Sequence, residues 1–159
     1  RSADFEVYVN KEIEIRIHEI REILANFGKS DFDWRTAFSS SSGFPNGCCG
    51  DATDLIGLYL SKYYELESTY VCGKGLGNNP NQSHAWLLCQ GYIIDITADQ
   101  FNAKGYKLAS VIIEKQSQFH DSFDTYKSHP FSANQLKDTG IPRVLAKVVS
   151  ELHKSKVAL

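Results

Sequence analysis

The spacing of apolar residues changes from helical to strand-like part-way along the chain. Isoleucine, leucine and phenylalanine recur at helical intervals over residues 10–27, which predicts an amphipathic helix. Asn10 is suited to cap its start and Gly28 to a left-handed stop. Directly after a turn signal at Pro45-Asn46-Gly47, a second apolar pattern at helical spacing predicts a buried central helix over about residues 52–63.

From Thr69 onward the pattern is that of β-strands. Short apolar runs predict strands over residues 69–72, 84–89, 92–97 and 108–114. Gln90-Gly91 separates two of these runs and is typical of a two-residue hairpin turn. The polar, glycine-rich stretch 73–82 predicts a loop. Residues 132–135 fit a capping box that begins a short helix, and Pro142 begins a terminal helix to about Lys154.

This order of elements, helices first and an antiparallel sheet afterwards, predicts an α+β fold. No internal repeat or linker interrupts the chain, so residues 1–159 are expected to form a single domain, and that length can bury a sizeable core. Helices at the N- and C-terminal ends are expected to pack around the sheet together with the central helix.

Charge and composition exclude two broad classes of function. The net charge is −2 and the lysines and arginines are scattered, whereas nucleic-acid binding requires a basic stripe. No apolar run approaches the ~18 residues that span a bilayer, and the beginning of the chain lacks a signal-peptide pattern. We therefore expect neither nucleic acid nor membrane as a partner, and a location in the cytoplasm or in the cytosol of a target cell.

Four cysteines are too few for a disulfide scaffold in a chain of 159 residues. Cys48 and Cys49 are adjacent, while Cys72 and Cys89 are isolated in strand-like runs. Zinc is the alternative use of cysteine and histidine, but zinc sites usually show Cys-x-x-Cys or His-x-x-x-His spacings, which this chain lacks. We therefore expect free thiols in a reducing compartment, with no metal and no cofactor.

The predicted hairpin brings a histidine and an aspartate together. With Gln90-Gly91 as the turn, Leu87 pairs with Ile94, and strand alternation then places His84 and Asp95 on the same face as diagonal neighbours. A carboxylate in that position can hold an imidazole in one tautomer. The register of the hairpin therefore predicts an Asp-His pair.

A cysteine at the start of the central helix completes a set of groups suited to acyl transfer. The positive end of the helix dipole and a nearby imidazole both favour the thiolate, and first-turn amides can stabilise an oxyanion. Cys49 is the expected nucleophile. Cys48, one position away, is expected to point into the core, although it is the alternative nucleophile.

The segment Gly47-Cys48-Cys49-Gly50-Asp51-Ala52-Thr53 resembles the nucleophile motif Gly-x-Cys-x-Asp-x-Ala/Ser/Thr of transglutaminase-like proteins, and papain-like peptidases have a related motif. His84-Ala85-Trp86 is similar to the His-Ala-Trp strand of that superfamily, and Asp95 matches the aspartate on its next strand. The resemblance implies a papain-like/transglutaminase-like fold with Cys49, His84 and Asp95 as a catalytic triad. Two positions depart from the pattern: Gly50 replaces a bulky residue, and Gly43 replaces the glutamine that serves as second oxyanion donor.

The second oxyanion donor and the substrate-binding residues are open from sequence. The candidates are Asn46, Gln82, Trp86 and Gln100, with Trp86 favoured as a packing residue or pocket wall. The other histidines are expected at the surface or in local roles: His18, His120, His129 and His153.

The resemblance implies a protein or peptide substrate attacked at an amide bond. Glutamine deamidation, transglutaminase-type cross-linking and peptide hydrolysis all stay open. The chain contains no methionine, and one interpretation is that it is the effector or toxin domain of a larger protein, with an inhibitor or immunity protein as a further partner. The alternative from another class is a catalytically inactive binding domain that retains the fold.

Overall fold

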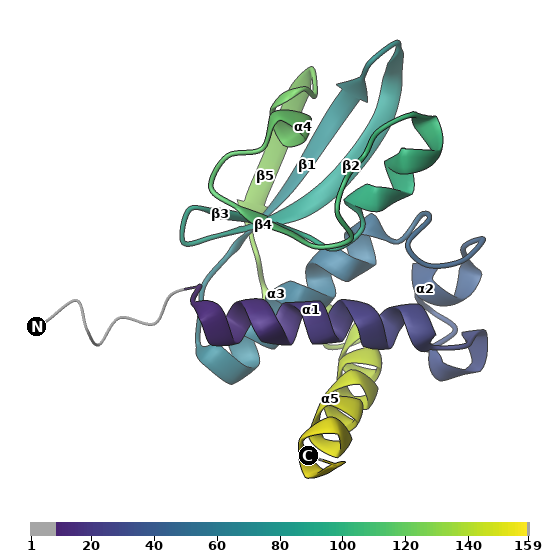
Figure 1. The fold of residues 1–159 in the computed structure, drawn as a ribbon, viewed down its shortest axis with the longest axis vertical. Helices are drawn as coiled ribbons and strands as arrows, with labels where there is room; N and C mark the ends of the chain where they lie inside the picture. Colours follow the sequence, from purple (N-terminus) through teal and green to yellow (C-terminus); the bar gives the residue numbers. More distant parts are fainter. Residues whose placement is uncertain (1–8, 159) are drawn as a thin grey trace, which may run out of the picture.

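The structure, a computed structural model, describes residues 9–158 as an α+β fold around a five-stranded antiparallel sheet (Figure 1). The strand order is β4-β3-β2-β1-β5, with β1 (Thr69–Leu76), β2 (Asn79–Cys89), β3 (Tyr92–Asp95), β4 (Ile112–Glu114) and β5 (Thr125–Pro130). The helices are α1 (Lys11–Asn26), α2 (Ala37–Ser40), α3 (Cys49–Tyr64), α4 (Gln118–Asp121) and α5 (Ile141–Ala158). Short 3-10 helices are η2 (Lys29–Asp31), η3 (Ala98–Lys104) and η4 (Ala133–Leu136).

Helix α1 begins as its sequence predicts and ends differently. The Asn10 side chain accepts a hydrogen bond from the Ile13 backbone N–H at 3.0 Å, which is the expected N-cap. The predicted left-handed stop at Gly28 is wrong. The helix ends at Phe27 in an extended conformation, and Gly28 itself has a φ of −86° and precedes η2. The chain therefore leaves α1 directly into a second helical turn.

Helices α1, α3 and α5 pack together on one face of the sheet (Figure 1). The apolar stripe of α1 is fully enclosed there, with Ile13, Ile17 and Ile20 at 0% exposure. Burial of apolar side chains on this scale is the dominant favourable contribution to folding. The central helix α3 buries residues on more than one side, because it lies between β2 on one side and α5 on the other.

The β1–β2 hairpin is longer than predicted, and the expected loop over residues 73–82 is wrong. Gly73 is a strand residue. A Cβ added at this position would lie 2.7 Å from the Phe123 ring and 2.9 Å from Trp86. Gly75 has a φ of +85° and lies at a bulge in β1. These glycines therefore mark close packing and a bulge within a strand.

The hairpin at Gln90-Gly91 is confirmed. The observed register pairs Leu87 with Ile94, Leu88 with Ile93 and Cys89 with Tyr92, as predicted. The second strand ends earlier than expected, at Asp95, because the Asp95 carboxylate accepts the backbone N–H of Thr97 and turns the chain.

The remaining elements depart from the sequence patterns in extent. The predicted strand over residues 108–114 shortens to the three residues of β4, and the Ser132 side chain makes no capping hydrogen bond to η4. The edge strand β5 was not predicted. All six of its residues are exposed, so it lacks the apolar alternation that marks a half-buried strand.

A second, largely aromatic cluster covers the other face of the sheet. It joins Trp86 of β2 to Phe101 of η3, Phe119 of α4 and Phe123. The short elements η3 and α4 thus enclose this face, while the long helices enclose the first (Figure 1). Within residues 9–158, no helix is both long enough and apolar enough to cross a bilayer.

Candidate active site

Cys49 is the first residue of α3, with Cys48 as the N-cap. The Cys48 side chain makes no capping bond; it is fully buried, and its thiol lies 3.3 Å from the Asn46 carbonyl oxygen. Cys49 is partly exposed. The first-turn amides of an α-helix have no partner inside the helix, and its dipole favours a negative charge at this end. Of the two adjacent thiols, Cys49 is therefore the accessible one.

His84 and Asp95 form the pair that the hairpin predicted. His84 Nε2 lies 2.6 Å from Asp95 Oδ2, and both side chains are almost completely buried. The edge of the Phe101 ring packs against the imidazole, with ring centroids 5.1 Å apart. Low polarity around the pair strengthens the interaction of charge with charge.

Asp95 is held at both of its oxygens. Oδ1 accepts the Thr97 backbone N–H at 2.9 Å, and Oδ2 accepts from both His84 and a second histidine, His120, at 2.7 Å. Burial alone raises the pKa of this carboxyl, but the charge of His84 and the hydrogen bonds from the two imidazoles outweigh burial and lower it. Asp95 is therefore an anchored carboxylate.

His120 is the residue that sequence patterns missed, and its expected surface position is wrong. It is 1% exposed, on the four-residue helix α4, with Ser117 as the helix cap. Its Nδ1 lies 2.6 Å from Ser117 Oγ, and its ring packs edge-on against Trp86 at 4.6 Å between centroids. So short a helix leaves little periodic signal, and the contact with Asp95 joins segments far apart in sequence.

The hydrogen bonds fix where the protons lie. Asp95 is an acceptor only, so His84 and His120 each carry a proton on Nε2. Within residues 9–158, His84 Nδ1 has no hydrogen-bond partner of ordinary geometry, although it is buried. This is the nitrogen through which His84 can exchange a proton with Cys49, whose thiol interacts with the imidazole.

The pKa shifts of Cys49 and His84 match an imidazole–thiol pair. Burial raises the pKa of Cys49, but the nearby His84 imidazole and its charge, with the Ala85 backbone amide, outweigh burial and lower it. Burial lowers the pKa of His84, but the charge and hydrogen bond of Asp95 outweigh burial and raise this pKa to about 9. Both shifts favour a thiolate beside an imidazolium near neutral pH.

Gln100 connects the two loops that carry the site. Its Nε2 donates to the Thr97 carbonyl at 2.9 Å, and its Oε1 accepts the Gly47 backbone N–H at 3.4 Å. The side chain therefore ties the turn after Asp95 to the turn before Cys49. In this arrangement both ends of its amide are occupied.

Among residues 9–158, the other polar candidates make no hydrogen bond to the Cys49 thiol. Gln82 accepts from Lys104 at 2.7 Å and donates to the neighbouring Ser83 carbonyl. Asn46 is exposed and uses its backbone N–H and carbonyl to shape the turn before Cys48. The first-turn amides of α3 are therefore the best-placed oxyanion donors.

Two sequence features near Cys49 have structural explanations. Trp86 is 4% exposed and packs within the aromatic cluster, which makes it a packing residue and not an open substrate platform. A Cβ at Gly50 would lie 3.1 Å from the Tyr70 hydroxyl. Tyr70 thus occupies the space next to the thiol into which a bulky residue at position 50 would project.

His84, Asp95 and His120 could in principle hold a metal ion, because their ligand atoms all lie within 4.8 Å of one another. Ligands about 2.0–2.1 Å from a tetrahedral zinc would lie roughly 3.3 Å apart. The observed nitrogen–oxygen distances are 2.6 Å and 2.7 Å, which are those of hydrogen bonds. The three residues are therefore spaced as a hydrogen-bonded network.

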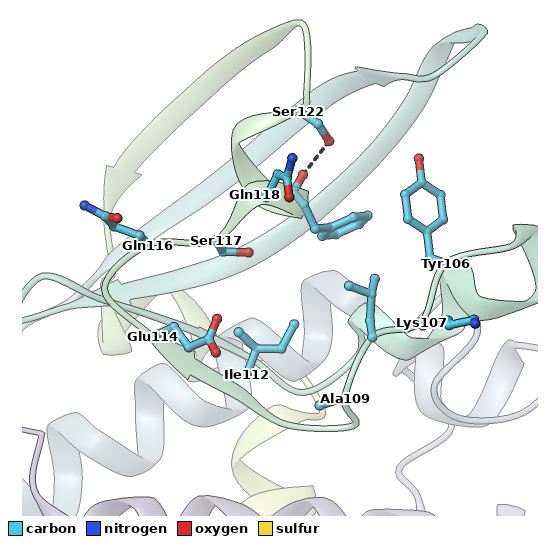
Figure 2. Close-up of a pocket in the computed structure, with 11 residues that line it drawn as sticks. Tyr106, Lys107, Ala109, Ile112, Glu114, Gln116, Ser117, Gln118 and Ser122 are labelled. Atoms are coloured by element: carbon cyan, nitrogen blue, oxygen red, sulfur yellow. Dashed lines mark hydrogen bonds between the residues drawn. The ribbon is translucent and has the colours of Figure 1, made fainter.

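A cavity of about 580 Å³ lies beyond the far end of this network (Figure 2). Ser117 and Gln118 line its upper wall, and Ile112 and Glu114 line the side that faces them. None of the triad residues lines it. The cavity adjoins the segment that positions His120 and is separate from the thiol.

Comparison with known proteins adds no assignment. No family model matches the chain, and no curated protein matches it. The crystal structure of the genomics target APC5867 aligns with 92% of this chain and 82% of its own, with a TM-score of 0.45 and 13% identity. A similarity at that level carries no argument about function, so the candidate site rests on its own geometry.

Proposed function

We propose that this protein is a cysteine-nucleophile enzyme of the papain-like/transglutaminase-like type, acting on amide bonds of a protein or peptide substrate. The observation that carries the proposal is the buried His84–Asp95 pair, which leaves only His84 Nδ1 free to serve the thiol of Cys49. A thiol, an imidazole and a carboxylate in this relation have the parts and the order of a nucleophilic catalytic triad.

In the first half-reaction, the Cys49 thiolate attacks the substrate carbonyl carbon and a carbon–sulfur bond forms. The carbonyl oxygen gains the negative charge, which the amides at the start of α3 stabilise. His84 then gives its Nδ1 proton to the amide nitrogen as the carbon–nitrogen bond breaks. The products are a free amine or ammonia and a thioester on Cys49, with His84 left neutral.

In the second half-reaction, neutral His84 takes a proton from water or from an acceptor amine, which attacks the thioester. The tetrahedral intermediate collapses, the carbon–sulfur bond breaks and the thiolate is regenerated beside the imidazolium. Peptide hydrolysis, deamidation and transamidation share these steps and differ only in the leaving amine and the acceptor. The thioester is therefore the common species to detect.

A non-catalytic binding domain is the second candidate function, and one observation favours it. Gly43 stands where papain-like enzymes have the glutamine that serves as second oxyanion donor, and Gln100 has both amide ends engaged. A single missing donor of this kind costs roughly 10²–10³ in rate. The lowered pKa of Cys49 favours the enzyme, because a domain without chemistry gains nothing from an activated thiol.

The test uses p-nitrophenyl acetate as an acyl donor, with the acylated residue located by peptide mass mapping. We expect a burst of nitrophenolate, a hydroxylamine-sensitive acetyl thioester on Cys49, and loss of both in Cys49→Ala. His84→Gln should slow the burst by roughly 10²-fold or more, because the general acid–base group is gone. Equal acetylation of all four cysteines, or a burst unchanged in His84→Gln, would overturn the proposal.

We further propose that the protein works in a compartment where thiols stay reduced. That compartment is the cytosol of a target cell if the protein is an effector or toxin domain. An inhibitor or immunity protein would then be expected to cover the mouth of α3, because that is where the thiol is accessible.

A further inference from the structure

We propose that His120 is a positioning residue of the catalytic network, which shares one carboxylate oxygen of Asp95 with His84 and thereby limits how strongly that carboxylate holds the His84 proton. The inference rests on the proposed function for its catalytic consequence. It does not depend on that function for its physical test, which is a titration of His84.

The geometry of His120 is that of a built contact. Its Nε2 reaches the same oxygen as His84, at 2.7 Å compared with 2.6 Å, and its own side chain is 1% exposed. Its other ring nitrogen, Nδ1, lies 2.6 Å from Ser117 Oγ, and Tyr126 donates to its backbone carbonyl at 2.7 Å. The orientation of the ring is therefore fixed.

The second ring nitrogens of the two histidines differ in surroundings. His120 Nδ1 lies against the Ser117 hydroxyl, whereas His84 faces Cys49 at Nδ1. Both histidines nevertheless donate from Nε2 to the same Asp95 oxygen. Two imidazole donors thus compete for one oxygen.

Competition for that oxygen weakens the hold of Asp95 on the His84 proton. The His120 N–H dipole has its positive end on Asp95 Oδ2, so it draws off part of the negative charge that stabilises the His84 imidazolium. The titratable groups that face the His84 ring are Cys49 from α3, Asp95 from β3 and His120 from α4. The other rings against it are aromatic and uncharged: Trp86, Phe101, Phe119 and Phe123.

The catalytic consequence lies in the second half-reaction. His84 must be neutral to take the proton of the attacking water or amine, and an imidazolium held too strongly by Asp95 cannot do so. By weakening that hold, His120 allows His84 to activate the water or amine that cleaves the thioester. Without its N–H, Oδ1 is still anchored by Thr97, so the carboxylate stays in place and holds the His84 proton more tightly.

The test is an NMR titration of the His84 imidazole in a Cys49→Ala background, where the thiol no longer titrates. His120→Phe removes the donor and keeps an aromatic ring in the aromatic cluster, while His120→Gln keeps an N–H at the position of Nε2. We expect the His84 pKa to rise by ~0.5–1 unit in His120→Phe and to stay near the parent value in His120→Gln. His18→Gln, at an exposed position on α1, is the control.

In the protein with Cys49 present, His120→Phe should slow hydrolysis of the acetyl thioester by ~3–10-fold near pH 7, and should slow it more than it slows the nitrophenolate burst. A His84 pKa that is unchanged or lower in folded His120→Phe would overturn the inference. If that variant does not fold, Ser117→Ala replaces it, because losing the hydroxyl frees the His120 tautomer; a His84 pKa identical to the parent would then overturn the inference. Failure of Cys49 to acylate would count against the proposed function alone, since the titration requires no turnover.

Discussion

Cys48 and Cys49 are consecutive in the chain, yet their thiols lie in opposite electrostatic surroundings. Cys48 turns inward at the start of α3, and burial raises its pKa. Cys49 turns towards His84, and although burial acts on it as well, the imidazole lowers its pKa. The helix start thus carries one accessible, activated thiol and one buried, inert thiol.

The first prediction is selective alkylation of Cys49. At pH 6.5, iodoacetamide should modify Cys49 before Cys48 and before Cys89, whose pKa burial raises to about 11. Peptide mass mapping over a pH series gives the rate for each cysteine. The selectivity should disappear in His84→Gln; equal rates for Cys48 and Cys49 in the parent protein would contradict the arrangement.

A second prediction separates structure from chemistry at the same helix start. Cys48→Ala removes a buried thiol that contacts the Asn46 carbonyl and Ser41, so we expect a loss of about 1 kcal/mol in the free energy of unfolding. Urea denaturation measures this. Alkylation of Cys49 should continue at close to the parent rate in this variant, whereas Cys49→Ala should remove the fast-reacting thiol with little loss of stability.

How far the sequence predicts this site can be judged from the hairpin. The dipeptide Gln90-Gly91 predicts the turn, the turn predicts the register, and the register predicts that His84 and Asp95 share a face. Each step is local and depends on alternation along a strand. The cysteine at the start of α3 is equally local, because a turn signal and an apolar helical pattern mark the helix.

The parts that sequence missed depend on contacts between distant segments. Glycine is rare in strands, so the sequence pattern predicts a loop at Gly73. In the fold, the Phe123 ring occupies the space that a side chain at this position would take. His120 lies on a helix of four residues, which is too short to show a periodic pattern, and only the fold brings it to Asp95. The exposed edge strand β5 lacks the apolar residues from which strands are recognised.

A third prediction concerns Gln100, which ties the turn before Cys49 to the turn after Asp95. Gln100→Leu keeps the volume and removes both hydrogen bonds, so the thiol and the imidazole should lose some of their alignment. We expect acetylation of Cys49 to slow by ~3–10-fold. Gln116→Leu, at an exposed position in the loop after β4, is the matched control and should acylate at the parent rate. Identical burst rates for the two variants would show that the tie has no role.

The fourth prediction is a stability that falls as pH rises. The folded-state pKa of His84 is about 9, above its usual value of ~6.5, so between these values the folded chain keeps a proton that the unfolded chain loses. The contribution is fully present below pH ~6.5 and is lost as pH rises through about 9. Urea titrations of the parent protein and of His84→Gln should therefore converge in that window. Parallel curves from pH 6 to 9 would contradict the raised pKa.

A fifth prediction follows from the 2.6 Å and 2.7 Å spacings of the two histidines about Asp95. Because these are hydrogen-bond distances, treatment with a chelator followed by dialysis should leave the acetylation rate of Cys49 unchanged. Metal analysis of the same samples provides the control. A rate that falls with EDTA and returns with Zn²⁺ would show that the cluster works as a metal centre.

Under the proposed function, the burial of His84 limits which molecules can complete the reaction. At 1% exposure the ring is closed on the side of the aromatic cluster, and its nitrogen without a partner faces the thiol. An attacking water or amine would therefore approach the base from the side of Cys49, where the departing amine also leaves. Substitutions around the start of α3 should then change the balance between hydrolysis and cross-linking while the Cys49 thiol stays activated.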